Sequence, residues 1–128
     1  MEKKIIGSAA VIAMVAIALG AFGAHALKDR LDLQQFATFE TGVRYQMYHA
    51  LFLLFVGSTN ALKIGAKKTI FYVTLFGILF FSVSIYLLAT QSISGINFKP
   101  IGFITPIGGL LLLIAWGFLI KELLRTKS

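Results

Sequence analysis

Apolar residues along this chain fall into four long runs, and short polar or charged connections separate each run from the next. A helical run of about 20 apolar residues crosses the roughly 30 Å hydrocarbon core of a bilayer, because each residue adds about 1.5 Å. The pattern therefore predicts four transmembrane helices, at residues 5–27, 43–62, 69–89 and 101–120. These spans use nearly the whole chain, so we expect a single transmembrane domain over residues 1–128.

Composition agrees with a membrane protein. Hydrophobic residues make up 58% of the chain and charged residues only 13%, whereas soluble domains are about 45–50% apolar. The expected fold is all-α: an integral membrane four-helix bundle, embedded in the lipid bilayer. The chain has no cysteine, which excludes disulfides and thiolate chemistry.

The positive charges predict an orientation. The net charge is +7, and most of the cations flank the spans on the side that holds both termini. Because cytoplasmic segments carry an excess of Lys and Arg, we expect both termini to be cytoplasmic in a multi-pass protein of the cell (inner) membrane. No basic stripe is interleaved with exposed aromatic residues, which argues against nucleic-acid binding. The cations on the terminal side are Lys3, Lys4, Lys63, Lys67, Lys68, Lys121, Arg125 and Lys127.

The first span ends in Ala24-His25-Ala26, which has the form of a signal-peptidase site. Its apolar run exceeds the 7–15 residues that are usual in a signal peptide, so we expect the span to be retained. Small residues recur every four positions along it and allow a close neighbour. We therefore expect this helix in the middle of the bundle, and we expect the phenylalanine-rich third span to face lipid over much of its surface.

The connection after the first span carries the signals of a helix start. Asp32 can cap the next turn, Gln35 can reach back to it, and Leu31 with Phe36 can form a hydrophobic staple. A short amphipathic interfacial helix is therefore expected from about Leu33, leading into the second span. Gly42 is the expected bend. Without it, residues 33–62 form one helix of roughly 45 Å.

The last span has two possible starts. Thr105-Pro106 forms a good N-cap and first-turn pair, and Pro100 can serve equally. We expect this end to pack closely against a neighbour through Gly108 and Gly109. A broken, ligand-facing helix of the transporter kind is the alternative.

Candidate chemistry gathers near the exterior boundary. Glu40, Arg44 and Tyr48 recur on one helical stripe, where Glu40 before Arg44 is the favourable order for an ion pair. Tyr45 and His49 lie on the neighbouring stripe. The Glu40–Arg44 pair is expected to set the orientation of these side chains. A simpler interpretation is that the stripe anchors the helix at the membrane interface, with the tyrosines at headgroup level.

His25 and His49 lie at similar depths on adjacent spans. Two such histidines could ligate a haem iron, or with Glu40 a divalent metal, but their spacing is not distinctive. We expect no metal and no cofactor; each histidine should instead bond a helix carbonyl, Glu40 or a tyrosine. Catalytic motifs are absent from the sequence. Ser82 and Ser84 are expected to be small packing residues that bond their own helix, and the protein is not expected to be an enzyme.

Three motifs in order resemble one known family over essentially the whole chain. They are "GAFGAHAL" (20–27), "FETGVRYQMYHAL" (39–51) and "ITPIGGLLLLIAW" (104–116). The resemblance is to the small bacterial membrane proteins of the domain of unknown function 423 family, also called uncharacterised protein family 0382. It implies four spans and supplies no activity. This chain departs from the family where a glycine-serine pair is expected in the third span, since it reads "LFFSVSIY" there.

The leading hypothesis is that these three motifs converge on one outer-leaflet site. It would bind a lipid or lipophilic small molecule, or a partner membrane protein, in a non-enzymatic accessory or structural role. Transport or facilitation of a small molecule is the alternative, and a bis-His haem or quinone-linked redox protein is a further one; homo-oligomerisation stays open. The predicted ligand or partner residues are His25, Glu40, Arg44, Tyr45, Tyr48, His49 and Thr105. The predicted close-packing residues are Gly20, Gly23, Gly42, Pro106, Gly108 and Gly109.

Overall fold

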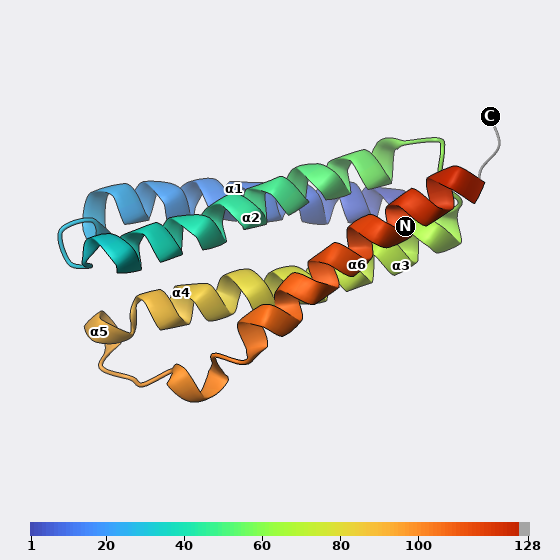
Figure 1. The fold of residues 1–128 in the computed structure, drawn as a ribbon. Coiled ribbons are helices and arrows are strands. Elements are labelled where there is room, and N and C mark those ends of the chain that lie inside the picture. Colours follow the sequence, from blue (N-terminus) through green and yellow to red (C-terminus); the bar gives the residue numbers. More distant parts are fainter. Residues whose placement is uncertain (126–128) are drawn as a thin grey trace.

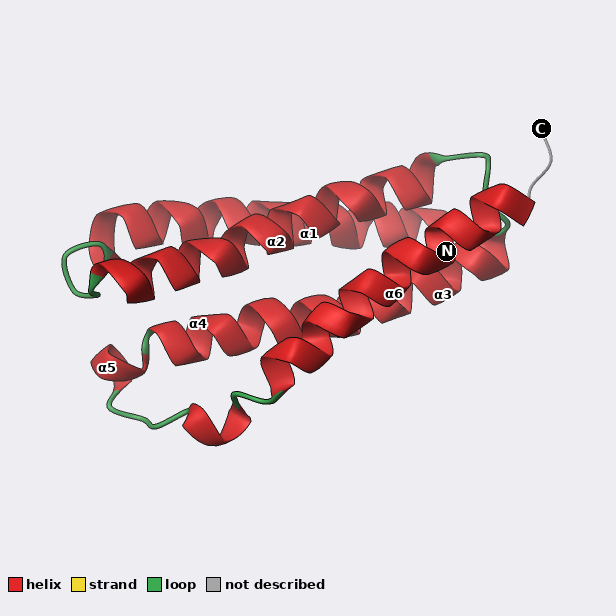
Figure 2. Cartoon of the chain, viewed as in Figure 1, coloured by secondary structure: helices red, strands yellow, loops and turns green. Residues whose placement is uncertain are grey.

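A computed structural model describes residues 1–125, which form long helices joined by short segments (Figure 1). Helix α1 (Glu2–Phe22) continues into a π-helical turn, η1 (Gly23–Leu27), and α2 (Leu33–Ser58) follows. A third rod joins α3 (Ile64–Ile78), the π-helical turn η2 (Leu79–Val83) and α4 (Ser84–Ala89). The short helix α5 (Gln91–Ser94), a 3₁₀ turn η3 (Lys99–Ile101) and the last long helix, α6 (Ile104–Arg125), complete the described residues. That part of the chain contains no strand (Figure 2).

The four rods run alternately up and down. The start of α1, the end of α6 and the α2–α3 connection therefore lie at one end of the molecule, called here the terminal end (Figure 1). Residues 28–32 and 90–103 lie at the opposite, far end. Helix α1 packs mainly on α2, and α6 packs mainly on α3 and η2, while α2 joins these two pairs through α3 and α4.

Three segments are long and apolar enough to cross a membrane: Glu2–Leu27, Ile64–Ala89 and Lys99–Arg125. Helix α2 is as long as the others but is not one of them, and it carries Arg44, Gln46 and His49 in its central turns. The all-helical fold of a membrane protein is thus confirmed.

Helix α2 begins where the sequence predicts. Asp32 Oδ1 accepts a hydrogen bond from the backbone amide of Gln35 at 2.7 Å, and Gln35 Oε1 accepts one from the amide of Asp32 at 3.3 Å. This reciprocal capping box satisfies two amides of the first turn. The helix then continues through Gly42 without a break, so the interfacial segment is not an element of its own. Its 26 residues give a length of about 39 Å.

The last long helix begins at Ile104, close to the second of the two predicted starts. Pro100 lies in the separate 3₁₀ turn η3. Pro106 lies in the first turn of α6. Backbone amides in this turn have no acceptor within the helix, so the lack of an N–H group on proline breaks no hydrogen bond there. Its side chain is exposed rather than closely packed.

The prediction of which rods lie inside was wrong. Of the three apolar segments, the third rod is the most buried: 44% of an 18-residue apolar stretch of it lies inside the protein, against 17% for the first span and 22% for the last. The third rod packs on both α2 and α6, and Phe71 is fully buried there. Helix α1 touches mainly α2, so Ala18 and Ala21 remain exposed. Small side chains permit close packing but do not require it.

Two hydrophobic clusters hold the rods together, one toward each end. The cluster nearer the terminal end contains Ile5, Leu53, Ile70 and Ala115, which come from all four rods. The cluster at the far end contains Leu27, Leu31, Phe39 and Ala89. Polar side chains cross the bundle between these clusters, and they build the candidate site.

Candidate functional site

His49 is buried in the middle of α2 and uses both ring nitrogens. Nδ1 lies 2.7 Å from the backbone oxygen of Tyr45, one turn earlier, and Nε2 lies 3.1 Å from the indole nitrogen of Trp116 on α6. A carbonyl can only accept and an indole N–H can only donate. His49 is therefore a neutral ring that carries its proton on Nδ1, and its hydrogen bond with Trp116 links α2 to α6.

A pocket of about 140 Å³ lies beside this pair, between α2, η2 and α6. We call it the lateral pocket, because Tyr45, Trp116 and Leu113 in its wall are all exposed on the side of the bundle. Its lining is almost entirely apolar. The lining residues are Tyr45, His49, Phe81, Gly109, Leu112, Leu113 and Trp116.

Gln46 bridges three rods with one buried amide. Its Nε2 donates to the backbone oxygen of Ile12 on α1 at 3.0 Å, and its Oε1 accepts from the hydroxyl of Tyr86 on α4 at 2.6 Å. Tyr86 in turn lies against the ring of Phe39. An amide satisfied on both sides fixes the relative position of the helices that it joins.

Two serines make a second set of bonds across the bundle. Ser82 Oγ donates to the backbone oxygen of Gly42 at 2.8 Å, which joins η2 to α2. The sequence predicted that Ser82 would bond its own helix backbone, whereas this bond goes to α2. Ser84 does bond its own helix, at the oxygen of Phe80, but its hydroxyl also lies 2.6 Å from Thr105 Oγ1 at the start of α6.

Glu40 and Arg44 are both exposed and do not form an ion pair within residues 1–125. Arg44 Nη2 instead donates to Thr41 Oγ1 at 3.3 Å. Both side chains border a recess of about 90 Å³ between α1 and α2, called here the charged hollow. Its walls are formed by Gly20, Gly23, Phe39, Glu40, Val43 and Arg44.

The predicted site residues thus do not meet in one place. Tyr45 and His49 face the lateral pocket, whereas Glu40 and Arg44 face the charged hollow on another side of α2. Tyr48 is exposed next to the Tyr45 ring. The Thr105 hydroxyl forms a hydrogen bond with the hydroxyl of Ser84. His25 is exposed on η1. Within the described residues, no group of three or more His, Cys, Asp or Glu is placed to hold a metal ion.

Three of the predicted close-packing glycines are required by their neighbours. A Cβ on Gly108 would lie 2.3 Å from the backbone nitrogen of Phe81, one on Gly42 would lie 2.7 Å from the Tyr86 ring, and one on Gly23 would lie 2.9 Å from the Phe39 ring. Gly20 and Gly109 have ordinary contact distances of 3.5 Å. Helix α6 thus approaches the backbone of η2 most closely at Gly108.

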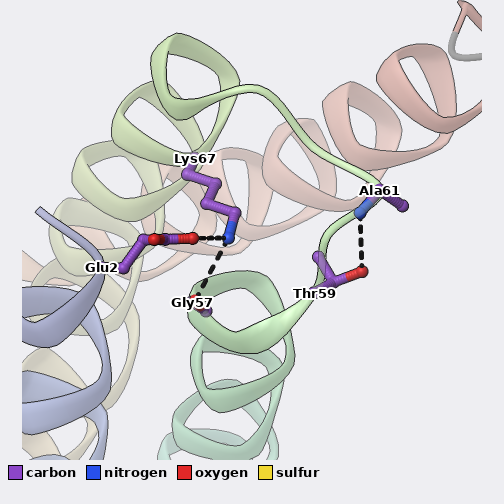
Figure 3. A network of polar contacts seen from close by, with 5 residues as sticks. All are labelled: Glu2, Gly57, Thr59, Ala61 and Lys67. Carbon is purple, nitrogen blue, oxygen red and sulfur yellow. Dashed lines mark hydrogen bonds and ion pairs between the residues drawn. The ribbon is translucent and has the colours of Figure 1, made fainter.

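Lys67 forms a polar cluster at the terminal end that sequence reasoning did not find. Its ammonium is almost fully buried, pairs with the carboxylate of Glu2 and donates to the backbone oxygen of Gly57 at 3.2 Å (Figure 3). Because Gly57 belongs to the last turn of α2, the cation also meets the negative end of that helix dipole. One side chain therefore joins α1, α2 and α3.

Helical spacing carried a signal for both of the missed bridging residues. Lys67 lies three and four residues before the buried Ile70 and Phe71. Gln46 lies four residues after the buried Gly42 and three before His49. Positions three or four apart share one face of a helix, so each polar residue could have been assigned to the inward stripe. Their partners Glu2 and Ile12 lie 65 and 34 residues away in the chain, so helical spacing could not have identified them.

Comparison with known proteins places the chain in a family. Residues 19–109 match the family model described as "Protein of unknown function (DUF423)". The chain is 40% identical over 111 residues to UPF0382 membrane protein SSP2132 of Staphylococcus saprophyticus, covering 87% of this chain and 88% of the relative. It is 38% identical over 109 residues to UPF0382 membrane protein YwdK of Bacillus subtilis, with 84% and 85% covered.

A more distant relative is UPF0382 inner membrane protein YgdD of Escherichia coli, 30% identical over 122 residues, which cover 93% of this chain and 88% of the relative. No solved structure matches the chain. The resemblance read from the three sequence motifs is therefore confirmed, and this chain belongs to the DUF423 family of membrane proteins.

Proposed function

We propose that this protein is a four-span, non-enzymatic protein of the cell membrane that binds a lipophilic chain in its lateral pocket. The pocket itself carries the proposal: it is apolar, it opens on the side of the bundle, and the polar ring in its wall is already fully bonded. Such a recess suits an acyl chain or another lipophilic group supplied from within the bilayer.

Helix α2 is proposed as the remaining span, although it is the least apolar. Its length of about 39 Å exceeds the roughly 30 Å of hydrocarbon. Gln46 and His49 are bonded inside the bundle, as the low polarity of the membrane interior requires. Of the exposed cations, Lys3, Lys4, Lys63, Lys68 and Lys121 lie toward the terminal end, which supports cytoplasmic termini. Lys127 lies outside the described residues.

The topology is tested with single cysteines, because the natural chain has none. Asn60→Cys lies in the α2–α3 connection and Asn97→Cys lies in the segment before α6; both positions are exposed. In intact cells, a membrane-impermeant maleimide should label the cysteine at position 97 and spare the one at position 60. Lysed cells should show labelling of both. Equal labelling of the two in intact cells would contradict the proposed spans.

The size of the lateral pocket indicates how it is used. About 140 Å³ is less than the roughly 300–1,000 Å³ that encloses a drug-sized ligand. The pocket therefore holds one segment of a molecule whose remainder lies in the bilayer. The paired nitrogens of His49 favour binding over catalysis or iron ligation, because neither nitrogen is free to act as a base or a ligand.

Trp116 gives a direct test, because it is the sole tryptophan and forms part of the pocket wall. A phospholipid brominated midway along one acyl chain is titrated into proteoliposomes of unbrominated lipid, and indole fluorescence is followed. Occupation of the pocket should give a quenching component that saturates at low mole fraction, above the gradual quenching expected of any lipid-exposed tryptophan.

Gly109→Leu should remove the saturable component, because the new side chain fills the pocket. Gly117→Leu is the matched control: it adds the same side chain to the same helix, where a Cβ meets nothing within 4 Å. If quenching rises only in proportion to mole fraction, or if both variants behave like wild type, the pocket does not bind the chain.

A further inference from the structure

The charged hollow has opposite charges at its border. Glu40 and Arg44 both border it, one helical turn apart, and each is exposed rather than bonded to the other. Charges within a membrane protein are costly unless they meet a partner or reach the interface. The recess between Glu40, Arg44 and the glycines of α1 is empty of protein atoms, so it has room for a partner of these charges that comes from outside the chain.

Counting along the helices places the hollow at the membrane surface. A hydrocarbon core of about 30 Å measured from Ile5 ends near residue 25 of the first span, at 1.5 Å per residue. Gly23 faces Phe39 across the antiparallel α1–α2 contact, so the boundary crosses α2 near residue 37, and Glu40 lies about one helical turn inside it. Arg44 begins about 6 Å deeper than Glu40. Helical side chains tilt toward the N-terminus of their helix, which for α2 is the far end, so the guanidinium extends back toward the boundary.

This order of charges matches a phospholipid headgroup with both signs. In such a lipid the phosphate lies next to the glycerol and the amine lies farther out. Arg44, the deeper residue, can bind phosphate oxygens with two parallel N–H donors. Glu40, nearer the surface, can accept hydrogen bonds from a primary ammonium. We infer that the charged hollow binds the phosphoethanolamine headgroup of a membrane phospholipid in the leaflet at the far end.

The two charges together select this headgroup over others. A phosphatidylglycerol headgroup offers a phosphate to Arg44 but no cation to Glu40, whose charge would then repel it. A phosphatidylcholine headgroup carries a cation with no N–H donor. The hollow faces a different side of α2 from the lateral pocket, so the headgroup site can be present whether or not the lateral pocket binds a chain.

Native mass spectrometry of purified protein tests the inference after exchange into mixed micelles that contain equal amounts of phosphatidylethanolamine, phosphatidylglycerol and phosphatidylcholine. Wild-type protein should retain phosphatidylethanolamine preferentially. Arg44→Gln should reduce that adduct about tenfold, as expected for loss of a charged hydrogen-bonding partner. Glu40→Gln should abolish the preference over phosphatidylglycerol. Gly20→Leu, which fills the hollow and alters neither charge, should lower retention like Arg44→Gln.

Asp29→Asn and Arg30→Gln are the matched controls, since they remove exposed charges at the same end but outside the hollow; both should retain lipid like wild type. Unchanged helical circular dichroism and a single chromatographic peak establish that each variant is folded. Preferential retention of phosphatidylglycerol, or displacement of the lipid by inorganic phosphate, would overturn the inference in favour of a simple phosphate site. A lipid-free dimer that dissociates in Arg44→Gln would overturn it in favour of a second copy of the chain.

Discussion

His49 lies between a group that can only accept a hydrogen bond and a group that can only donate one. The Tyr45 carbonyl holds the proton on Nδ1, and the Trp116 indole occupies Nε2. A histidine in this arrangement is a structural bridge between α2 and α6. The sequence suggested a helix carbonyl as a partner, whereas Trp116 lies 67 residues away and no local pattern links the two.

A double-mutant cycle measures this bridge. His49→Phe, Trp116→Phe and the double variant are unfolded by titration with sodium dodecyl sulfate and followed by circular dichroism. Hydrogen bonds between membrane helices couple by about 0.6 kcal/mol on average, so the double variant should be less destabilised than the sum of the two single variants by roughly that amount. Strict additivity would mean that the bond does not contribute to stability.

The start of α2 shows how far sequence reasoning reaches for a single element. The capping box of Asp32 and Gln35 forms as predicted, because both partners lie within one turn and the chemistry is local. At the predicted bend, Gly42, helix α2 continues without a break. Gly42 is present because Tyr86 and Ile85 of α4 lie against it, and a glycine required by a neighbouring helix has the same sequence signature as a glycine at a hinge.

Removal of the cap should weaken the protein measurably. Asp32→Ala is expected to lower the free energy of unfolding by about 1 kcal/mol, since the amide of Gln35 loses its acceptor. Asp29→Ala, three residues earlier and outside the helix, is the control and should change stability little. The same detergent titration measures both variants, and equal losses would show that the cap is not the cause.

The contact between α6 and η2 depends on Gly108. Gly108→Ala should destabilise by about 1–3 kcal/mol, because its Cβ would meet the backbone of Phe81, which cannot move away as a side chain could. Gly117→Ala, on the same helix with open space around it, should be neutral or stabilising by up to about 1 kcal/mol. If Gly108→Ala is as stable as Gly117→Ala, the two rods do not approach each other this closely.

On the scale of the whole molecule, sequence periodicity predicted the membrane class and the helical fold but not the arrangement of the rods. Span positions depend on apolar runs, which the sequence displays directly. The burial of each rod depends on which rods pack against it. Helix α3 packs on both α2 and α6, whereas α1 packs mainly on α2. The candidate residues of α2 were divided for the same reason: Tyr45 and His49 turn toward α6, and Glu40 and Arg44 turn toward α1.

The Lys67 cluster should respond asymmetrically to mutation. The side chain of Lys67 is 2% exposed, whereas that of Glu2 is 54% exposed. Glu2→Gln leaves a buried cation without its counter-ion, which is strongly unfavourable. Lys67→Met leaves a carboxylate that water can reach. Glu2→Gln should therefore lower the free energy of unfolding more than Lys67→Met does.

The double variant Glu2→Gln/Lys67→Met should return to the stability of Lys67→Met, because no buried charge then lacks a partner. Lys68→Met, an exposed neighbour, serves as the control for loss of a positive charge at this end. Detergent titration ranks the four proteins. A larger loss in Lys67→Met than in Glu2→Gln would mean that the pair is not held in the buried position described.

The π-helical turn η2 determines how the third rod would respond to the deletion of a single residue. A π turn holds one residue more than the α-helical turn that it replaces, and each residue of a helix corresponds to about 100° of rotation. Deleting one residue between positions 79 and 83 would convert this turn to an ordinary α-helical turn, so α4 would keep its orientation and Tyr86 would still face Gln46. In an alignment of relatives, a single-residue gap at this point therefore indicates a regular α-helix whose link from Gln46 to α4 is kept, whereas a gap elsewhere in the third rod indicates an α4 rotated by about 100°.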